Sequence, residues 1–465
     1  MAPGAPPLKN DLLLLASLFL LELSIAAMPM AMYMKGDRPF TVFLSSNPGM
    51  VFLLAIAVFF IAGAIIGNQY LASKRSPSRR FRLIVTMNLV TVLLMLITGE
   101  IAMRILSRSS QEGETIGRVV LMPKSWETVA RHYRQLLDQV GGDLSYLVYD
   151  DLMGWTVGPN RRSDNGLYRS SSEGIRAPHE GVTFAKIAGK TRIALVGDSF
   201  TFSEEVAYED SWGYALEQAL GSEFQVLNFG VPGYGIDQAH LRNEKDVRLW
   251  KPKIVIFGFI SDDALRTMFV YTFLASPEWN MPFSKSRFIL RDGEITNINV
   301  PPLAPEAIFS RGSISELPLL EHQRGYRQSD WQRSLYHLSY LARLFISWLP
   351  RWSAVPPDVS EESLVSVNAS ILKAFARSVA QAGSIPLVVY FPSKEDFEKP
   401  SSHLPLGKRV LQQADIAYTD LTPCLLKLNS ADRFGPMRRH YSPQGNATVA
   451  NCLHTVVNEA LAQAS

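Results

Sequence analysis

The feature that most constrains the fold of this chain is a short apolar run that ends in three turn residues. Residues 193–196 are apolar and partly β-branched, and they are followed by Gly197, Asp198 and Ser199. An apolar run of this length, bounded by turn residues, is typical of a buried strand. A serine at the exit of such a strand lies where open α/β sheets hold their ligand sites. Glycine, aspartate and serine also favour ordinary turns, so the run alone leaves the function open.

Strand and helix patterns alternate after this run. Segment 210–221 has apolar residues at helical spacing, and the helix expected over 364–382 ends at Gly383, a common C-cap residue. Such alternation favours βαβ units and a parallel sheet. The sequence therefore predicts an α/β domain with five parallel strands, at 192–196, 225–229, 254–259, 385–391 and 417–421.

The first hundred residues are far more apolar than the rest. Hydrophobic residues make up 47% of the 465 residues, and they concentrate in three segments near the N-terminus. Each segment has about the 20 residues that cross the hydrocarbon core of a bilayer. A cleavable signal peptide is the alternative for the first, although its length and the single preceding Lys9 argue against it. We therefore expect an anchor over residues 1–105 with three transmembrane helices, Leu12–Met34, Met50–Ala72 and Leu83–Ile105.

The charges of the short loops predict the orientation of these spans. Loop 74–82 carries five cations and no acid, so it should remain in the cytoplasm. The protein would then be multi-pass in the cytoplasmic (inner) membrane, with a cytoplasmic N-terminus and an extracytoplasmic C-terminal domain beginning after about residue 106. Glu22 and Glu100 fall within or near the spans, where acids are functional candidates. Glu100, however, lies near the end of a span, where water is close, and Glu22 could instead pair with a polar group in a neighbouring helix.

Charge balance and cysteine usage restrict the partners and the compartment. The chain has 46 Lys+Arg against 43 Asp+Glu and no basic run interleaved with aromatics, so nucleic acid is not an expected partner. Cys424 and Cys452 both fall in the exported part. They predict one disulfide in an oxidising compartment, with two buried free thiols as the alternative.

Two further regions flank or interrupt the predicted sheet. Residues 106–190 form a linker and accessory segment, with a helix expected over 126–140 and short strand signals after it. An insertion at about 267–362 contains a hairpin, with strands at 287–290 and 295–300. An amphipathic helix is expected over Ser329–Trp352. Its apolar stripe would pack on its own domain or, as an alternative, lie on the bilayer surface.

Three other segments bring small or polar residues to the edge of the sheet that holds Ser199. The second strand leads into a glycine-rich turn that contains Gly233, and the third strand ends at Asp262. His440 lies just before a final helix, which Ser442 would cap and Pro443 would begin.

Together these segments resemble the SGNH (GDSL-type) hydrolase superfamily over residues 191–465, and most of all its membrane-anchored members, similar in kind to exopolysaccharide O-acetyltransferase and esterase domains. The resemblance implies a three-layer, flavodoxin-like fold with Ser199 as the nucleophile and His440 as the general base. The backbone N–H groups of Ser199 and Gly233 would form the oxyanion hole, together with the residue at position 262. A base within hydrogen-bond reach is what makes a serine hydroxyl nucleophilic, and oxyanion donors stabilise the charge that develops in acyl transfer.

Two positions depart from the pattern of this family. The family has an asparagine that donates to the oxyanion where this chain has Asp262, and an ionised carboxylate can only accept. The family also has an aspartate two or three residues before the histidine, where this chain has Met437 and Arg438. His440 would then be oriented by a backbone carbonyl or by another acid such as Asp432, or the site would be weakened.

The leading hypothesis is a membrane-anchored serine esterase or O-acyltransferase that acts on ester groups, acetyl first among them, of a cell-surface or exported polysaccharide. No cofactor and no metal are expected, because the sequence has no set of His, Cys and acids at metal-ligand spacing. A transferase with three spans would need a multispanning partner that supplies the acyl group. The alternatives are a catalytically degenerate SGNH-like scaffold that binds glycan or organises an assembly, and a polytopic transporter or sensor.

Overall fold

The computed structural model describes residues 16–24, 47–72, 79–117, 119–140, 145–348, 360–398, 404–437 and 439–463. The chain divides into two compact units. One comprises residues 1–129 and 327–353, and the other comprises residues 130–326 and 354–465. This division differs from the expected boundaries after residues 105 and 190, because most of the accessory segment clusters with the sheet and part of the insertion with the N-terminal unit.

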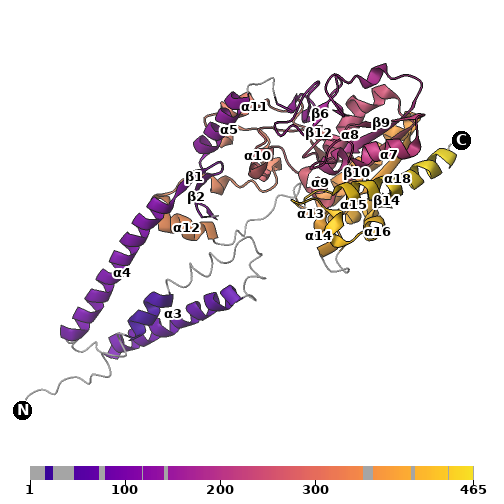
Figure 1. Ribbon diagram of the computed structural model, residues 1–465. Coiled ribbons are helices and arrows are strands. Elements are labelled where there is room, and N and C mark those ends of the chain that lie inside the picture. The colour runs from indigo at the N-terminus through magenta and orange to yellow at the C-terminus, as the bar shows by residue number, and fades with distance from the viewer. Residues whose placement is uncertain are drawn as a thin grey trace, which may run out of the picture. The chain divides into compact units, whose positions relative to one another are not determined.

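The second unit is built around a parallel sheet of five strands (Figure 1). In chain order the strands are arranged 2-1-3-4-5, which is the flavodoxin-like order. The predicted α/β class and all five predicted strands are therefore confirmed, with ends that differ by at most one residue. From one edge to the other the strands are β9 (Phe224–Asn228), β8 (Thr191–Gly197), β10 (Ile254–Phe259), β13 (Ile385–Tyr390) and β14 (Tyr418–Asp420).

Helices cover both faces of this sheet, because successive strand residues point to opposite sides. Val196 and Phe257 belong to the hydrophobic cluster on one face, whereas Leu195 and Ile256 belong to the cluster on the other. The first face is covered by α8 (Ile236–Lys245), α13 (Glu361–Gln381) and α15 (Leu406–Ala414), and the second by α7 (Trp212–Leu220) and α18 (Pro443–Gln463).

The main helices begin and end at residues that satisfy their terminal backbone groups. The Ser211 hydroxyl accepts from the N–H of Tyr214 at the start of α7. Gly383, at φ +79°, follows the end of α13, as expected. The other short helices of this unit are η1 (Phe184–Lys186), η2 (Val247–Trp250), α9 (Ser261–Arg266), α10 (Thr272–Ala275), η3 (Pro277–Trp279), α11 (Pro305–Phe309), η4 (Ile314–Glu316), η5 (Leu320–His322) and α14 (Lys394–Glu398).

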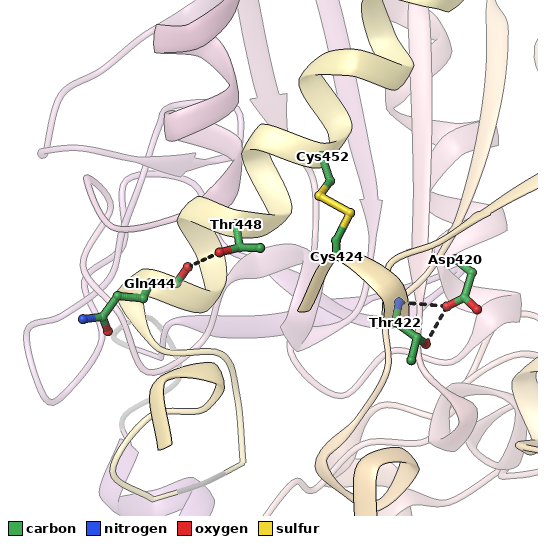
Figure 2. The surroundings of a disulfide bond; sticks show 6 residues. All are labelled: Asp420, Thr422, Cys424, Gln444, Thr448 and Cys452. Atoms are coloured by element: carbon green, nitrogen blue, oxygen red, sulfur yellow. Dashed lines mark hydrogen bonds between the residues drawn. A yellow bond between two sulfur atoms is a disulfide. The ribbon is translucent and has the colours of Figure 1, made fainter. Parts of the chain in front are cut away.

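A disulfide joins Cys424 to Cys452, as predicted (Figure 2). It ties α16 (Thr422–Leu425) to the middle of α18 across 28 residues of sequence. Asp420, at the end of β14, accepts the N–H and the hydroxyl of Thr422 and so starts α16. A loop of this length corresponds to about 3–4 kcal/mol of stabilisation in the chain-entropy description.

The accessory segment contributes to the core of the sheet domain. Trp155 and Ile175 are fully buried and lie in the same hydrophobic cluster as Leu227 of β9. Its elements are α5 (Trp126–Val140), the hairpin of β4 (Leu147–Asp150) with β5 (Gly154–Val157), and the pair β6 (Arg169–Ser170) and β7 (Arg176–Ala177). The predicted helix 126–140 is confirmed.

The insertion contains the predicted hairpin but not the predicted long helix. β11 (Arg287–Arg291) and β12 (Glu294–Ile298) pair across Asp292 and Gly293, which both have positive φ, as a type I′ hairpin turn requires. The helix predicted over Ser329–Trp352 is instead broken into η6 (Gln328–Asp330), η7 (Leu335–Leu338) and α12 (Tyr340–Trp348), and residues 349–352 lie outside the described ranges.

Side chains start new turns inside this predicted helix. The N–H of Ser334 donates to Nδ1 of His337, and the hydroxyl of Ser339 accepts from the N–H of Ala342. Serine competes in this way for backbone groups that a continuous helix would pair. The apolar periodicity therefore indicated helical residues correctly, but these residues belong to separate short helices instead of one long helix.

The N-terminal unit contains α3 (Asn47–Ala72), α4 (Arg79–Leu106), α12 and a small sheet of β1 (Arg108–Ser110), β2 (Gly113–Ile116) and β3 (Val119–Val120). Among the described residues one helix, Thr86–Leu106, is long and apolar enough to cross a membrane, and a shorter apolar stretch covers Leu53–Ile66. Of the first predicted span only residues 16–24 are described, and they are helical. Three transmembrane helices therefore stay a prediction.

Candidate active site

Ser199 lies at the first residue of α6 (Ser199–Phe202), immediately after β8. The carboxylate of Asp198 caps this helix by accepting the N–H of Phe200 at 2.9 Å. Position 197 must be glycine, because a Cβ there would lie 2.1 Å from Oγ1 of Thr201 and 2.2 Å from the carbonyl oxygen of Gly258. The glycine thus allows the sharp change from strand to helix that holds the Ser199 side chain at the end of the sheet.

His440 reaches Ser199 from the loop between α17 (Ser430–Arg433) and α18. Its Nε2 lies 2.9 Å from the Oγ of Ser199. The N–H of Gly435 donates to the His440 carbonyl at 2.8 Å, and the ring of Phe200 packs 5.0 Å from the imidazole, centroid to centroid. The structure therefore brings together the two residues that the sequence predicted as nucleophile and base.

The acid beside this histidine is Glu205, which the sequence reasoning missed. Oε1 of Glu205 lies 3.0 Å from Nδ1 of His440, so the imidazole is held between a hydroxyl and a carboxylate. Asp432 does not fill this place; its carboxylate accepts from the side-chain amide of Asn429. Met437 is exposed, and Arg438 lies outside the described residues.

Of the alternatives that the sequence left for His440, the structure shows an orienting acid from another part of the chain, and this acid is Glu205 instead of Asp432. The family pattern directs attention to the residues just before the histidine, whereas the carboxylate here comes from the loop that follows the nucleophile helix. The available signal was the pair of adjacent acids at 204 and 205, five and six residues after Ser199. Their spacing alone did not indicate which way the loop turns.

A second carboxylate, Glu204, also approaches His440. Its Oε2 lies 3.5 Å from Nε2, the nitrogen that faces Ser199. Burial raises the pKa of Glu204; the nearby His440 opposes this increase, and the charge of Glu205 adds to it. The hydroxyl and the base therefore lie in a strongly acidic surrounding.

Arg266 balances the buried acids beneath the nucleophile. Its Nη1 lies 3.3 Å from Oδ2 of Asp198 and 2.5 Å from Oδ1 of Asp263, and both carboxylates are buried. Burial and the neighbouring Asp198 raise the pKa of Asp263, whereas Arg266 opposes the increase. The same Nη1 donates to the carbonyl of Tyr234, which holds the glycine-rich turn after β9 close to Asp198.

The predicted oxyanion residues have different surroundings. Gly233, at φ +81°, lies in this glycine-rich turn, and a Cβ there would be 3.5–3.6 Å from Met281, Trp155 and Trp279. The Asp262 side chain stays exposed, yet nearby protein displaces much of the water around its carboxylate and raises its pKa; Arg266 opposes this increase. No hydrogen bond among the described residues joins either residue to Ser199, so their part in an oxyanion hole stays a prediction.

The arrangement of Ser199, His440 and Glu205 is suited to nucleophilic acyl transfer. The base lies within hydrogen-bond reach of the hydroxyl, and a third group orients the base. Within the described ranges no group of three or more His, Cys, Asp and Glu side chains could hold a metal ion. The expectation of no cofactor stays a prediction.

Comparison with known proteins gives structural likeness only. No family model and no curated protein match the chain. Among solved structures, a putative lipolytic protein of the G-D-S-L family from Desulfitobacterium hafniense is 15% identical, covering 57% of this chain and 99% of its own at a TM-score of 0.30. Axe2, an acetylxylan esterase from Geobacillus stearothermophilus, is 12% identical. The match covers 57% of this chain and 94% of Axe2, with a TM-score of 0.31. The esterase EstA from Pseudoalteromonas sp. is 10% identical. The match covers 58% of this chain and 99% of EstA, with a TM-score of 0.32.

Proposed function

We propose that this chain is a membrane-anchored serine esterase or O-acyltransferase of the SGNH (GDSL) type, acting on acetyl or related esters of a cell-surface or exported polysaccharide. The observation that supports it most is the contact series from Ser199 Oγ to His440 Nε2 and from His440 Nδ1 to Glu205. The apolar helix Thr86–Leu106 supports the membrane anchor. The polysaccharide substrate follows from the family resemblance and from the expected extracytoplasmic position of the domain.

In this mechanism His440 accepts the Ser199 proton at Nε2 as Oγ attacks the ester carbonyl. Glu205 accepts the Nδ1–H and stabilises the imidazolium that forms. Collapse of the tetrahedral intermediate releases the alcohol, which takes the proton from Nε2 and leaves an acyl group on Ser199. Water then completes hydrolysis, or a sugar hydroxyl completes transfer, with His440 again taking the proton of the attacking group.

The experiment uses the full-length protein in detergent with a chromogenic acetyl ester. Ser199→Ala should abolish turnover and labelling by a fluorophosphonate, and Glu205→Gln should lower kcat by about 10⁴-fold, the loss seen when the orienting acid of a serine enzyme is replaced. Ser315→Ala, an exposed serine of the insertion, serves as the control. Equal rates for wild type and Ser199→Ala would overturn the proposal.

The second candidate is a catalytically degenerate scaffold that binds glycan or organises an assembly. Asp262 still favours it, because an ionised carboxylate at the oxyanion position would repel the intermediate. The other feature that favoured it was the absence of an acid at the family's position before His440. Because Glu205 contacts Nδ1 of His440, this feature no longer favours the scaffold. Binding of an acetylated polysaccharide without turnover, by both wild type and Ser199→Ala, would support this candidate.

Hydrolase and transferase differ in what attacks the acyl group on Ser199. Adding a deacetylated glycan acceptor to the same assay distinguishes them: a transferase forms acetylated glycan, whereas an esterase forms only acetate. For a transferase we propose a multispanning membrane partner as the source of the acyl group.

A further inference from the structure

The loop that presents Glu205 follows a path that its own residues do not favour. Ser203 and Glu205 have φ values of 61° and 72°, in the left-handed region. Non-glycine residues held in this region cost about 1–3 kcal/mol each, and such a conformation persists only where the surroundings enforce it. Contacts from elsewhere in the chain must therefore hold the loop.

One buried arginine supplies most of these contacts. Arg176, on β7 in the accessory segment, is 1% exposed. Its Nη1 donates to the carbonyls of Phe202 and Ser203, and its Nη2 donates to the carbonyl of Val206 at 2.6 Å. The guanidinium also lies 4.5 Å from the ring centroid of Phe202. A planar guanidinium can bind several acceptors at once in a fixed geometry, which an ammonium cannot.

A tyrosine fixes the acidic residue itself. The backbone N–H of Glu205 donates to the hydroxyl of Tyr168 at 2.8 Å. The Tyr168 ring packs against Phe202 with 5.0 Å between centroids, and the Arg176 guanidinium lies 5.2 Å from the Tyr168 ring. The accessory segment thus holds both the backbone path of the loop and the amide of the residue that contacts His440.

We propose that Tyr168 and Arg176 are positioning residues that hold the Glu205 carboxylate against His440. This inference rests on the proposed acyl-transfer function. It gives the segment before the sheet a part in holding the acid that orients His440, in addition to its part in the core. Neither side chain would touch substrate; both act through Glu205.

The decisive variant is Tyr168→Phe, because it removes one oxygen and keeps the ring. We expect kcat/KM to fall about tenfold, since small misplacements of catalytic groups are costly. Because Tyr168 would act through the base and not on the substrate, the loss should fall on kcat with KM unchanged, as in Glu205→Gln.

Two controls separate positioning from a merely structural role. Tyr146→Phe changes a buried tyrosine that also packs on Phe202 but whose hydroxyl donates to the Arg169 carbonyl; its kcat and KM should match wild type. In the Glu205→Gln background, Tyr168→Phe should cost no further activity, because coupled residues are non-additive. Arg176→Lys should show the same loss of kcat at unchanged KM, in protein whose melting temperature shows that it is folded.

The outcomes are distinguishable from those of the functional proposal. If Ser199→Ala and Glu205→Gln both keep full activity, the acyl-transfer function itself fails. If those two variants lose activity while Tyr168→Phe behaves like Tyr146→Phe, only the positioning inference is overturned. A Tyr168→Phe loss that persists undiminished in the Glu205→Gln background would also overturn it, because the tyrosine would then act independently of the acid.

Discussion

The two ring nitrogens of His440 have different acidic neighbours, and this difference defines the site at the scale of single residues. Glu205 contacts Nδ1 with a largely buried side chain, so it suits an orienting role. Glu204 lies near Nε2, where the Ser199 proton is transferred, and its side chain is more exposed. A charged Glu204 would repel the oxyanion that forms nearby, so its protonation state bears on both stability and rate.

We predict that Glu204→Gln stabilises the protein at neutral pH but not at acidic pH. Burial raises the pKa of Glu204 above its usual 4.5, so the folded state disfavours the charged form. The resulting cost to folding is absent below the unfolded-state pKa. It grows as pH rises and is complete above the folded-state pKa, at about 1.4 kcal/mol for each pKa unit.

Melting temperatures of wild type and Glu204→Gln, measured from pH 4 to pH 8, test this prediction. The difference should be near zero at pH 4 and should increase towards pH 8. Glu209→Gln, an exposed acid a few residues later, is the control and should show little change. A constant difference across the range would contradict the assigned cause.

The sequence predicted Ser199 and His440 because each lies at a fixed place relative to a strand or a helix. Glu205 could not be predicted in this way. Its position depends on two residues with left-handed backbone and on Arg176, which is 29 positions earlier in the chain. The local sequence pattern does not predict the backbone path of this loop, because contacts with residues far away in the sequence hold the loop in place.

At the scale of elements, buried parallel strands were the easiest to predict, because they appear as continuous apolar runs. α12 shows the limit, since its apolar spacing predicted a helix more than twice as long. Its start is fixed by a residue far away in sequence. The carboxylate of Glu100 on α4 accepts from the hydroxyl of Ser339 and from the N–H groups of Tyr340 and Leu341 at 2.8–3.1 Å, and it also pairs with Arg104.

Glu100, which the sequence placed near the end of a span, therefore acts as a cap of α12. We predict that Glu100→Ala loosens residues 340–348, because the first N–H groups of a helix need acceptors. Loss of a cap costs about 0.5–2 kcal/mol, so amide hydrogen exchange in α12 should accelerate by about 2-fold to 30-fold.

Hydrogen exchange followed by mass spectrometry on the full chain in detergent measures this effect. Glu112→Gln, which removes a partner of Lys124 in the same unit, is the matched control and should leave α12 unchanged. Exchange in α18 should be the same in all three proteins. Unaltered protection of 340–348 in Glu100→Ala would show that other contacts hold α12.

At the scale of the whole molecule, three features support the predicted location of the sheet domain. Segment 74–82, which includes the start of α4, carries five cations and should stay in the cytoplasm. The stretch Thr86–Leu106 of α4, which follows that segment, is long and apolar enough to cross a membrane. The Cys424–Cys452 disulfide in the sheet domain fits an oxidising compartment. We therefore predict that residues from about 107 onward lie outside the cytoplasm.

Reporter fusions after residue 463 test this topology in intact cells. An enzyme that folds only in an oxidising compartment should be active there, whereas a fluorescent protein that matures only in the cytoplasm should stay dark. Replacing the five cations of segment 74–82 with glutamine removes the positive-inside signal. Part of the population should then insert in the inverted orientation, and those molecules should show fluorescence and no enzyme activity.

A fluorescent, enzymatically inactive wild-type fusion would place the domain in the cytoplasm and overturn the topology. An exported polysaccharide would then be out of reach of Ser199, whereas hydrolysis of a soluble acetyl ester would be unaffected. The location and the chemistry can therefore fail independently.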